Sequence, residues 1–412
     1  MKYIVVIGDG MADKPIAELG NKTPLEKAYK PEMDGMAREG FCGYAKTVPD
    51  GMVPESDTAN LGVMGYDPKI YSKGRSPLEA MSMGLTMSEL DTAYRCNIVT
   101  LSEGDTYEKL TILDHSADEI STEEADVLIK AIDKELGDSV KRFHTGISYR
   151  HCLLWENSPK PYDFMRPHDI LGKCIEEYLP KGNDGQVFLE LMKKSYDILN
   201  HHPVNEQRRK RGLKPANSIW LWSPGKKPAL PQFYDKYGIS ASVISAVDLI
   251  KGIGVCAGME VIEVEGATGN YKTNYSGKAK AALDSLCAGK DFVYIHVEAP
   301  DECGHRAETD NKVSSIEKID KEIIGFLNKE LKNRGIEYRM LFMPDHPTPI
   351  AIRTHASDPV PFVVYDSRKK QNSKAKSYDE YFGCAGKCAM GEDFDYLEHG
   401  YTLMDVLLEK QQ

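Results

Sequence analysis

Long apolar runs that stop at an acidic residue constrain this chain more than any other feature of its sequence. The runs are rich in Val, Ile and aromatic residues, which is typical of strands buried on both faces of a parallel sheet. Ligands of such sheets bind outside the carboxyl ends of the strands. Three runs end in this way: residues 2–8 at Asp9, residues 291–297 in the loop of Asp301, and residues 338–343 just before Asp345. We therefore expect these three carboxylates at one edge of a sheet.

The pattern along the chain predicts an α/β protein with an insertion. Residues 310–332 carry apolar side chains near a helical period of 3.6. Between about 91 and 230, short alternating runs lie between helical stretches without a repeated strand–helix rhythm, which favours a separate α+β unit. We expect a doubly wound sheet domain whose chain leaves for this insertion and then returns.

The expected boundaries follow from where turn-forming residues gather. Residues 67–77 and 223–232 are rich in Pro, Gly and Lys, and we interpret them as the two linkers. The predicted sheet domain then comprises 1–75 and 231–412, and the predicted substrate or lid domain, with its linkers, comprises 76–230.

A mixture of carboxylates and imidazoles indicates a site for divalent cations. Asp301 and His305 are four residues apart, and Asp345 is followed directly by His346, so neighbouring side chains could serve two different ions. His355 follows after nine residues in a Pro-containing loop. The plainer interpretations are a solvated loop for the first pair and a structural role for a lone His. For Asp9 the alternative is an ordinary Asp-Gly turn.

Ser56 is the candidate nucleophile of such a site. The sequence around it predicts a helix N-cap before a short helix over 58–64. A helix N-terminus offers free N–H groups to a phosphate, so a cap and a nucleophile are compatible at this position. Asn60, one turn later, could contact the same phosphate.

Composition and missing motifs exclude several classes of function. The formal net charge of −11 argues against a general nucleic-acid binder, and no window resembles a membrane span. Nine cysteines without a C-x-x-C pair favour a reduced, cytoplasmic protein. The chain lacks the glycine-rich loops of ATP and dinucleotide sites, and its sequence leaves the oligomeric state open.

The predicted insertion carries further candidates for proton transfer and for binding an anionic substrate. The candidates for general acid or base are His151, His168 and Asp169. For most of the basic run 208–211 a solvated helix end is the favoured interpretation. The candidate anion-binding residues are Arg75, Arg95, Arg150, Arg208 and Lys251.

Several long motifs, in order along nearly the whole chain, resemble one family. They are GDGMAD, VPESDTANLGVMGYDP, GRSPLEA, YRCNIVT, PHDILG, APDECGHRAE, MPDHPTPIAIRTHASDPVP and CAGKCAMG. The chain is similar to the archaeal-type 2,3-bisphosphoglycerate-independent phosphoglycerate mutases of the alkaline phosphatase-like metalloenzyme superfamily. The resemblance implies an alkaline phosphatase-like domain with an inserted domain and two divalent cations, usually Mn²⁺, with Zn²⁺, Co²⁺ or Mg²⁺ as alternatives.

The resemblance also implies roles for individual residues. Ser56 matches the serine that carries the phosphoryl group between 3-phosphoglycerate and 2-phosphoglycerate, in glycolysis and gluconeogenesis. The ligands of one cation would be Asp301, His305 and His355, and those of the other Asp9, Ser56, Asp345 and His346. The alternatives are a metal-dependent phosphomonoesterase with the same serine and an inactive scaffold. The insertion, as a lid that excludes water, favours a mutase over a hydrolase.

Two positions depart from the usual pattern of that family. Ser223 stands where a Gly usually precedes the Pro-Gly of the second linker, and Arg-Ala-Glu follows His305 where Gly or Asp is commoner. The first departure lies in the expected hinge and the second beside the expected cation ligands, which themselves are intact.

Overall fold

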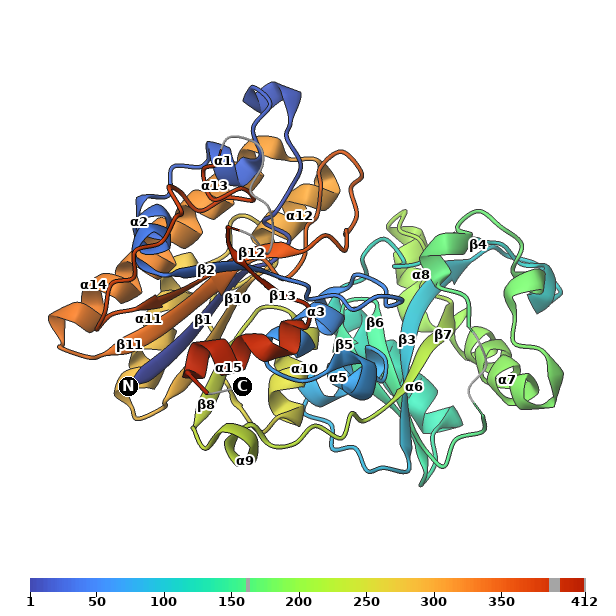
Figure 1. Cartoon of the computed structure of the whole chain (residues 1–412). Coiled ribbons are helices and arrows are strands. Elements are labelled where there is room, and N and C mark those ends of the chain that lie inside the picture. Colours follow the sequence, from blue (N-terminus) through green and yellow to red (C-terminus); the bar gives the residue numbers. More distant parts are fainter. Residues whose placement is uncertain (161–163, 385–392, 411–412) are drawn as a thin grey trace. The chain divides into compact units, whose positions relative to one another are not determined.

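The chain divides into two compact units. The computed structural model describes residues 1–160, 164–384 and 393–410, so most of the CAGKCAMG motif lies outside the described residues. Unit 1 comprises Met1–Ser72 and Ala229–Gln412, and unit 2 comprises Lys73–Pro228 (Figure 1). None of the described helices combines the length and the apolar character that crossing a lipid bilayer requires.

Unit 1 is built on a mixed sheet in the order β13-β2-β12-β11-β1-β10-β8-β9. The central strand β1 pairs in parallel with β10 and β11, whereas β12 is antiparallel to β11 and to β2. The strands are β1 (Lys2–Gly8), β2 (Phe41–Ala45), β8 (Ala241–Ile244), β9 (Glu260–Val261), β10 (Phe292–Val297), β11 (Tyr338–Met343), β12 (Val360–Asp366) and β13 (Asp395–Leu397). The apolar runs of the sequence thus form the expected buried strands.

Helices cover both faces of this sheet, which confirms the predicted α/β class. Figure 1 shows α11 and α14 on one side of the strands and α10 and α15 on the other. The helices are η1 (Ala17–Leu19), α1 (Pro24–Lys27), α2 (Pro31–Glu39), α3 (Ser56–Val63), α4 (Pro68–Tyr71), α9 (Phe233–Tyr237), α10 (Asp248–Cys256), α11 (Tyr275–Cys287), α12 (Ala299–Arg306), α13 (Thr309–Lys318), η5 (Ile319–Gly325), α14 (Phe326–Asn333), η6 (Gly400–Thr402) and α15 (Leu403–Leu408). The predicted amphipathic helix is the continuous run of α13, the π-helical η5 and α14.

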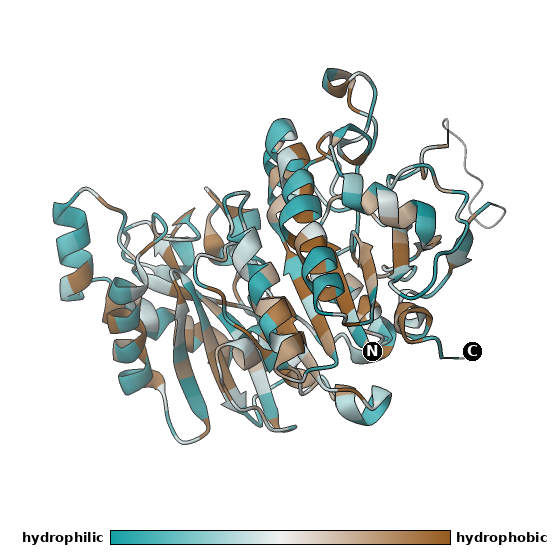
Figure 2. Ribbon diagram, turned by 90° about the vertical axis from the view of Figure 1, so that its left-hand side faces the viewer, coloured by the Kyte–Doolittle hydropathy of each residue, from teal (hydrophilic) through white to brown (hydrophobic). Residues whose placement is uncertain are grey.

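The core of unit 1 follows from the alternation of side chains along the strands. Ile4 and Val6 of β1 pack with Val293 and Ile295 of β10 against Ile323 and its neighbours from the helical run. Figure 2 shows this as hydrophobic strand residues and helix faces turned toward them, with hydrophilic residues outside. Burying such a continuous apolar layer fixes the strand register and therefore the positions of the loops at the strand ends.

Unit 2 is an α+β structure around an antiparallel sheet in the order β4-β3-β6-β5, with β7 also paired to β3. Its core is separate from that of unit 1 and includes Tyr94, Phe188 and Trp220. The elements are α5 (Ser76–Ser82), β3 (Asp91–Leu101), η2 (Tyr107–Lys109), β4 (Ile112–Asp114), α6 (Thr122–Leu136), β5 (Lys141–Ile147), β6 (Arg150–Glu156), η3 (Pro167–Ile170), η4 (Ile175–Tyr178), α7 (Gly182–Leu199), α8 (Pro203–Lys210) and β7 (Ser218–Lys226).

The interpretation of 223–232 as a linker was wrong in its first half. Strand β7 continues to Lys226, which pairs with Thr92 of β3. The Pro and Gly of this segment lie where the register of the pair shifts, between Ala93 and Arg95, so the ladder tolerates them as an irregularity. Pairing with a long neighbouring strand outweighed the local turn signal.

Both departures from the family pattern fall at left-handed backbone positions. Ser223 has φ 49°, and Ala307, which ends α12, has φ 54°. Glycine adopts this conformation without the steric cost of a Cβ atom, which explains why a Gly would be favoured at each place.

Candidate metal and phosphoryl-transfer site

Residues from five separate segments converge at the carboxyl ends of the central strands of unit 1. Asp9 follows β1, Ser56 begins α3, and Asp301 and His305 lie on α12, which begins two residues after β10. Asp345 and His346 follow β11, and His355 lies in the loop before β12. All seven side chains predicted as cation ligands therefore belong to unit 1.

Asp301, His305 and His355 form the first group of possible ligands. Asp301 Oδ2 lies 3.2 Å from His305 Nε2, and Asp301 Oδ1 lies 3.4 Å from His355 Nε2. The two imidazoles face each other with their Nε2 atoms 2.9 Å apart. His305 Nδ1 lies 2.9 Å from the backbone oxygen of Arg353, and His355 Nδ1 lies 2.7 Å from that of Pro54. Each Nδ1–H can donate a hydrogen bond to its carbonyl, which leaves Nε2 as the nitrogen that can coordinate a cation.

Asp9, Asp345 and His346 form the second group, with Ser56 beside it. His346 Nε2 lies 3.5 Å from Asp9 Oδ1, 3.6 Å from Asp345 Oδ2 and 3.2 Å from Ser56 Oγ. Ligand atoms of Asp9, Asp345 and His346 all lie within 4.8 Å of one another, and the same holds for Asp301, His346 and His355. His346 thus lies between the two groups rather than with one of them alone.

The carboxylates of the site are buried close together, and their surroundings shift the pKa values of Asp9 and Asp301 in opposite directions. Burial, with the neighbouring carboxylates Asp345 and Asp301, raises the pKa of Asp9 well above its usual value. Burial also disfavours ionised Asp301, but hydrogen bonds from His305 and His355 outweigh it and hold the pKa of Asp301 well below its usual range. The bond to Asp301 in turn raises the pKa of His305 to about 9.

The donor set fits divalent cations. Three carboxylates lie together in a buried place, where their mutual repulsion favours a positive charge. Asp9 Oδ1 is buried without a hydrogen-bond partner among the described residues, and His305 and His355 point the same nitrogen at each other. Carboxylate oxygen with imidazole nitrogen, which gives up its proton when a cation binds, is a mixture that Zn²⁺, Mn²⁺ and Co²⁺ accept.

Several buried residues that the sequence analysis did not select hold these ligands in place. Thr47 Oγ1 donates to the backbone oxygen of Asp345 at 2.5 Å, and the N–H of Gly10 donates to Asp345 Oδ1 at 3.1 Å. Thr348 Oγ1 donates to Asp301 Oδ1. Gly10 and Thr348 both lie within quoted motifs, GDGMAD and PDHPTP, but only the folded chain shows what they contact.

His296 of β10 was also missed. Its Nε2 lies 3.0 Å from Asp9 Oδ2, and this buried nitrogen makes no hydrogen bond to the described residues. Burial lowers the pKa of His296 to about 4, so the ring is neutral near pH 7. The sequence signal was a histidine inside an otherwise apolar strand.

Asn60 was predicted to contact phosphate, but its side chain is occupied within the protein. The amide nitrogen donates to Asp345 Oδ2 at 2.7 Å and to the backbone oxygen of Ser56 at 2.8 Å, and its oxygen accepts from the hydroxyl of Tyr294. Because Asn60 is fully buried, its observed role is to hold Asp345.

Ser56 begins α3, but it is not the N-cap. The N-cap is Glu55, whose backbone is extended, and no side chain caps the helix. The hydroxyl of Ser56 is instead near His346 Nε2, so the first residue of α3 lies beside the second group of ligands.

Unit 2 brings Arg95 and His168 together in an aromatic cluster. The guanidinium of Arg95 lies 4.5 Å from the ring centre of Trp222 and pairs with Glu79. The ring of His168 lies 5.7 Å from that of Trp222 and 6.0 Å from that of His115. Asp169 Oδ1 is 3.7 Å from His168 Nε2, yet burial outweighs this carboxylate and lowers the pKa of His168. Glu79, His115 and Trp222 were not selected from the sequence.

The side chains of two other predicted residues of unit 2 are buried and form hydrogen bonds within the protein. Arg208 is 1% exposed, pairs with Glu124 and donates to the backbone oxygen of Ala117 at 2.5 Å, so its guanidinium is not presented to a substrate. His151 is 5% exposed, accepts from the N–H of Gly146, and has a pKa that burial lowers to about 3. The predicted roles of both in substrate chemistry are therefore not supported by their surroundings.

The remaining predicted residues are placed as follows. The guanidinium of Arg150 lies 5.6 Å from the ring centre of Tyr149, and Arg75 directly precedes α5. Lys251, on α10 of unit 1, pairs with Asp248 at 3.3 Å and Glu263 at 3.0 Å.

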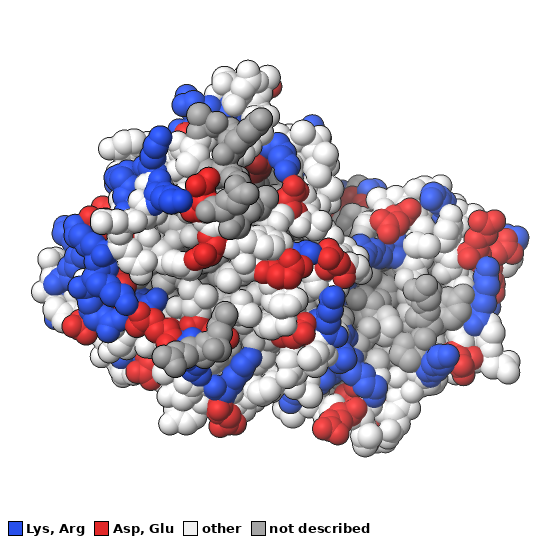
Figure 3. All heavy atoms as spheres, in the orientation of Figure 1, with Lys and Arg blue, Asp and Glu red and all other residues white. Residues whose placement is uncertain are grey.

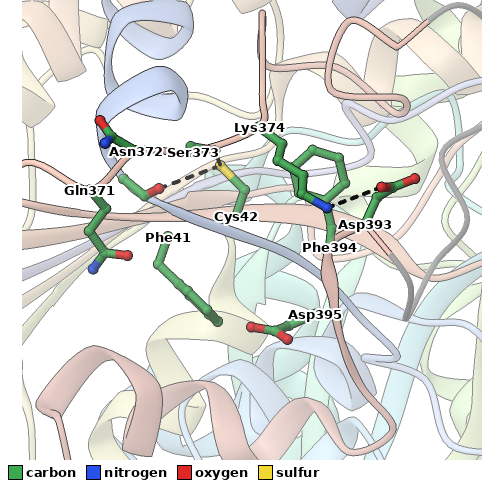
Figure 4. A pocket seen from close by; sticks show the side chains of 10 residues that line it. Phe41, Cys42, Gln371, Asn372, Ser373, Lys374, Asp393, Phe394 and Asp395 are labelled. Carbon is green, nitrogen blue, oxygen red and sulfur yellow. Dashed lines mark hydrogen bonds and ion pairs between the residues drawn. The ribbon is translucent and has the colours of Figure 1, made fainter.

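A pocket at the edge of the unit 1 sheet contains none of these groups. Its volume is about 220 Å³, and Figure 4 shows Cys42, Ser373 and Lys374 among its lining residues. Burial raises the pKa of the Cys42 thiol to about 11, and Lys374 pairs with Asp393 at 3.3 Å. The thiol is therefore protonated near neutral pH and has no nucleophilic character there.

Basic side chains do not form an uninterrupted surface on the face shown in Figure 3. Lys and Arg gather over α14 and the neighbouring strand ends, with Asp and Glu beside them. Among the basic residues that follow β12, Lys369 pairs with Glu409 at 2.6 Å and Lys370 with Glu39 at 2.5 Å. Much of this positive charge is thus neutralised locally.

The whole chain is similar to proteins of one enzyme family. A probable 2,3-bisphosphoglycerate-independent phosphoglycerate mutase of Geobacter sulfurreducens is 46% identical over 410 residues, which span 100% of both chains. The chain belongs to the 2,3-bisphosphoglycerate-independent phosphoglycerate mutases. The mutase of Methanosarcina barkeri is 50% identical over 381 residues, 92% of this chain and 94% of that one. The model of this mutase family matches residues 37–205.

Solved structures agree with this family membership. A protein of Pyrococcus horikoshii superimposes with a TM-score of 0.80 at 29% identity and covers 100% of this chain and 98% of its own. The cofactor-independent phosphoglycerate mutase of Thermoplasma acidophilum gives a TM-score of 0.67 at 27% identity, with 99% of both chains covered. As a member of this mutase family, the chain is an isomerase.

Proposed function

We propose that the protein interconverts 3-phosphoglycerate and 2-phosphoglycerate through a phosphoserine at Ser56, at a site that holds two divalent cations. The observation that carries this proposal is the position of Ser56 Oγ, 3.2 Å from His346 Nε2, which itself lies 3.5 Å from Asp9 Oδ1 and 3.6 Å from Asp345 Oδ2. Relatives of the same length are named as phosphoglycerate mutases, which supports the substrate.

Membership of the mutase family implies Mn²⁺, with Zn²⁺, Co²⁺ or Mg²⁺ as alternatives, and carboxylates with imidazoles are compatible with it. One cation would be held by Asp301, His305 and His355 and the other by Asp9, Asp345, His346 and Ser56. Bound cations would neutralise phosphoryl oxygens and lower the pKa of the serine hydroxyl.

The proposed reaction has two in-line displacements. Ser56 Oγ forms a bond to phosphorus and loses its proton, while the bond between phosphorus and the 3-oxygen of the glycerate breaks and that oxygen gains a proton. In the second step the 2-oxygen of the same glycerate bonds to phosphorus, loses its proton, and Ser56 Oγ leaves and is protonated again. No net proton or water is consumed, as an isomerisation requires.

Unit 2 is proposed to serve the glycerate part of the substrate. Arg95 and Arg150 offer guanidinium groups suited to a carboxylate, and His168 with Asp169 can move a hydroxyl proton because a lowered pKa keeps the imidazole neutral near pH 7. Excluding water from a phosphoserine is the second role proposed for this unit.

A metal-dependent phosphomonoesterase with the same serine is the alternative. An enolase-coupled assay with 3-phosphoglycerate separates the two activities, since a mutase yields phosphoenolpyruvate and a phosphatase yields inorganic phosphate. Release of phosphate without formation of phosphoenolpyruvate would contradict the proposed function.

Replacing the nucleophile tests the intermediate. We expect Ser56→Ala to lower kcat by a factor on the order of 10⁴ or more, because the covalent path is lost. Mass spectrometry of protein quenched with substrate should find phosphate on the peptide of Ser56 in the wild type alone. Ser276→Ala, at an exposed serine in the first turn of α11, is the matched control and should retain both activity and the modification. Phosphate on another residue would reject Ser56 as the nucleophile.

A further inference from the structure

Thr348 is the only described residue whose side-chain hydroxyl is recorded in contact with ligands from both groups of the site. Its Oγ1 donates to Asp301 Oδ1 and lies 3.3 Å from His346 Nδ1. Asp301 belongs to the first group, whereas His346 Nε2 faces Asp9, Asp345 and Ser56. A single buried hydroxyl therefore joins the two groups.

The proton positions in this chain of contacts are determined by the acceptors. The hydroxyl of Thr348 donates to Asp301 Oδ1, as a carboxylate that holds a cation can only accept. The remaining lone pairs of Oγ1 can accept a proton from His346 Nδ1 at 3.3 Å, and the backbone of Pro347 is a second hydrogen-bond partner of this imidazole. His346 then carries its proton on Nδ1, and Nε2 presents a lone pair toward Ser56 and the carboxylates.

The backbone holds Thr348 in place from several sides. Its N–H donates to the backbone oxygen of Ala12 at 3.2 Å, and its own backbone oxygen accepts from Lys312 Nζ at 2.8 Å. Thr348 and Lys312 are both fully buried. The hydroxyl is therefore held at one place relative to the N-terminal loop that carries Asp9.

Two glycines leave the space that this side chain occupies. A Cβ atom on Gly10 would lie 2.4 Å from Thr348 Oγ1, and one on Gly304 would lie 2.8 Å from Thr348 Cγ2. The backbone of the loop after β1 and that of α12 thus both lie against the side chain of Thr348.

We propose that Thr348 is a positioning residue that couples the two cation sites, by fixing the tautomer of His346 and the orientation of Asp301. This inference rests on the proposed two-cation function. Removing an outer hydrogen bond of a metal ligand typically weakens the metal by about 10- to 100-fold. Because Thr348 contacts one ligand of each group, loss of its hydroxyl weakens both cations, whereas loss of a contact to one group weakens one.

The test is a Co²⁺ titration of the full-length apoprotein, followed by the visible absorption of bound cobalt. Thr348→Val removes only the hydroxyl, and we expect dissociation constants about 10- to 100-fold higher for both equivalents, with a changed spectrum. Thr348→Ser keeps the hydroxyl and should restore both. Thr47→Val is the matched control, because this equally buried hydroxyl contacts only the backbone of Asp345, and it should affect one equivalent at most.

The outcomes separate the two proposals. Wild-type affinity for both equivalents in Thr348→Val, or weakening of one equivalent as in the Thr47 variant, overturns the coupling role. A wild-type protein that binds fewer than two equivalents overturns the two-cation function as well. If the valine variant does not fold, Thr348→Ala deletes the same hydroxyl without adding a methyl group next to Gly10, and it is compared with Thr348→Ser in the same titration.

Discussion

Single atoms decide whether the site can form, and Gly10 shows this most clearly. Its backbone is left-handed, with φ 59°, and a Cβ atom would lie 2.7 Å from Asp301 Oδ1 and 2.9 Å from Asp301 Cα. Both backbone strain and displacement of a ligand therefore oppose any side chain at this position. Residues of this kind are needed for the geometry although they ligate nothing.

We expect Gly10→Ala to lower the free energy of unfolding by about 1–3 kcal/mol and to weaken Co²⁺ binding by at least about tenfold. Gly20→Ala is the matched control, because Gly20 has a similar φ of 72° but open space around its Cα. It should cost about 1 kcal/mol and leave the metal affinity unchanged. Urea unfolding and a cobalt titration measure the two effects, and equal metal affinity in both variants would show that the contact with Asp301 is unimportant.

At the scale of elements, distant segments cap and brace the helices that carry the site. The N-terminus of α2 has no cap from its own N-cap residue, Lys30. Asp320, from the π-helical η5, instead accepts from the N–H of Met33 at 2.7 Å and from that of Glu32 at 3.4 Å. The π-helical turn thus places a carboxylate where α2 needs an acceptor.

This cap predicts a specific dependence of stability on pH. Burial raises the pKa of Asp320 from 3.8 to about 6, so the folded state binds this proton more tightly than the unfolded state. Its contribution is fully present below about pH 4 and is lost as the pH rises to about 6, by at most about 3 kcal/mol. We expect Asp320→Asn to flatten this part of the stability profile of the apoprotein, measured by urea unfolding. Asp310→Asn, at an exposed position of α13, should keep it. An unchanged slope in the Asp320 variant would contradict the assignment.

At the scale of the whole molecule, the predicted cation ligands lie in one unit and the tryptophans in the other. All seven proposed ligands belong to unit 1, whereas the three tryptophans of the chain, Trp155, Trp220 and Trp222, belong to unit 2. Each unit has its own buried core. Tryptophan fluorescence therefore reports on unit 2, and a signal from the whole backbone reports on both.

Metal removal should consequently act on one unit. At a Mn²⁺ concentration about 100 times the dissociation constant, we expect each bound cation to stabilise unit 1 by about 2.7 kcal/mol, because only the folded unit brings the buried carboxylates together to hold it. The far-ultraviolet circular dichroism transition in urea should divide into two steps, of which only one moves on chelation. The transition seen by tryptophan fluorescence should stay in place. A fluorescence transition that shifts as much as the dichroism would mean that the units unfold together.

The sequence by itself determined which segments form the buried strands, which acidic or histidine residues follow them, and which of these residues are candidate ligands. Continuous apolar runs are buried as strands, and a carboxylate or histidine that directly follows such a run lies at the end of that strand. This placement follows from the local sequence alone. The same local pattern misjudged Ser56 as a cap and extended a linker into β7. It also selected Arg208 and Asn60 as substrate contacts, and both side chains have partners within the protein.

Only the tertiary structure decided which side chains meet. His346 lies between the two ligand groups, and Thr348 contacts Asp301 and His346. Arg208 forms an ion pair with Glu124. These contacts join segments that are far apart in sequence. Hydrogen bonds and buried charges depend on distances of a few ångströms, which no spacing along the chain specifies. The sequence thus specifies which residue types the site contains, whereas the fold specifies which of them are in contact.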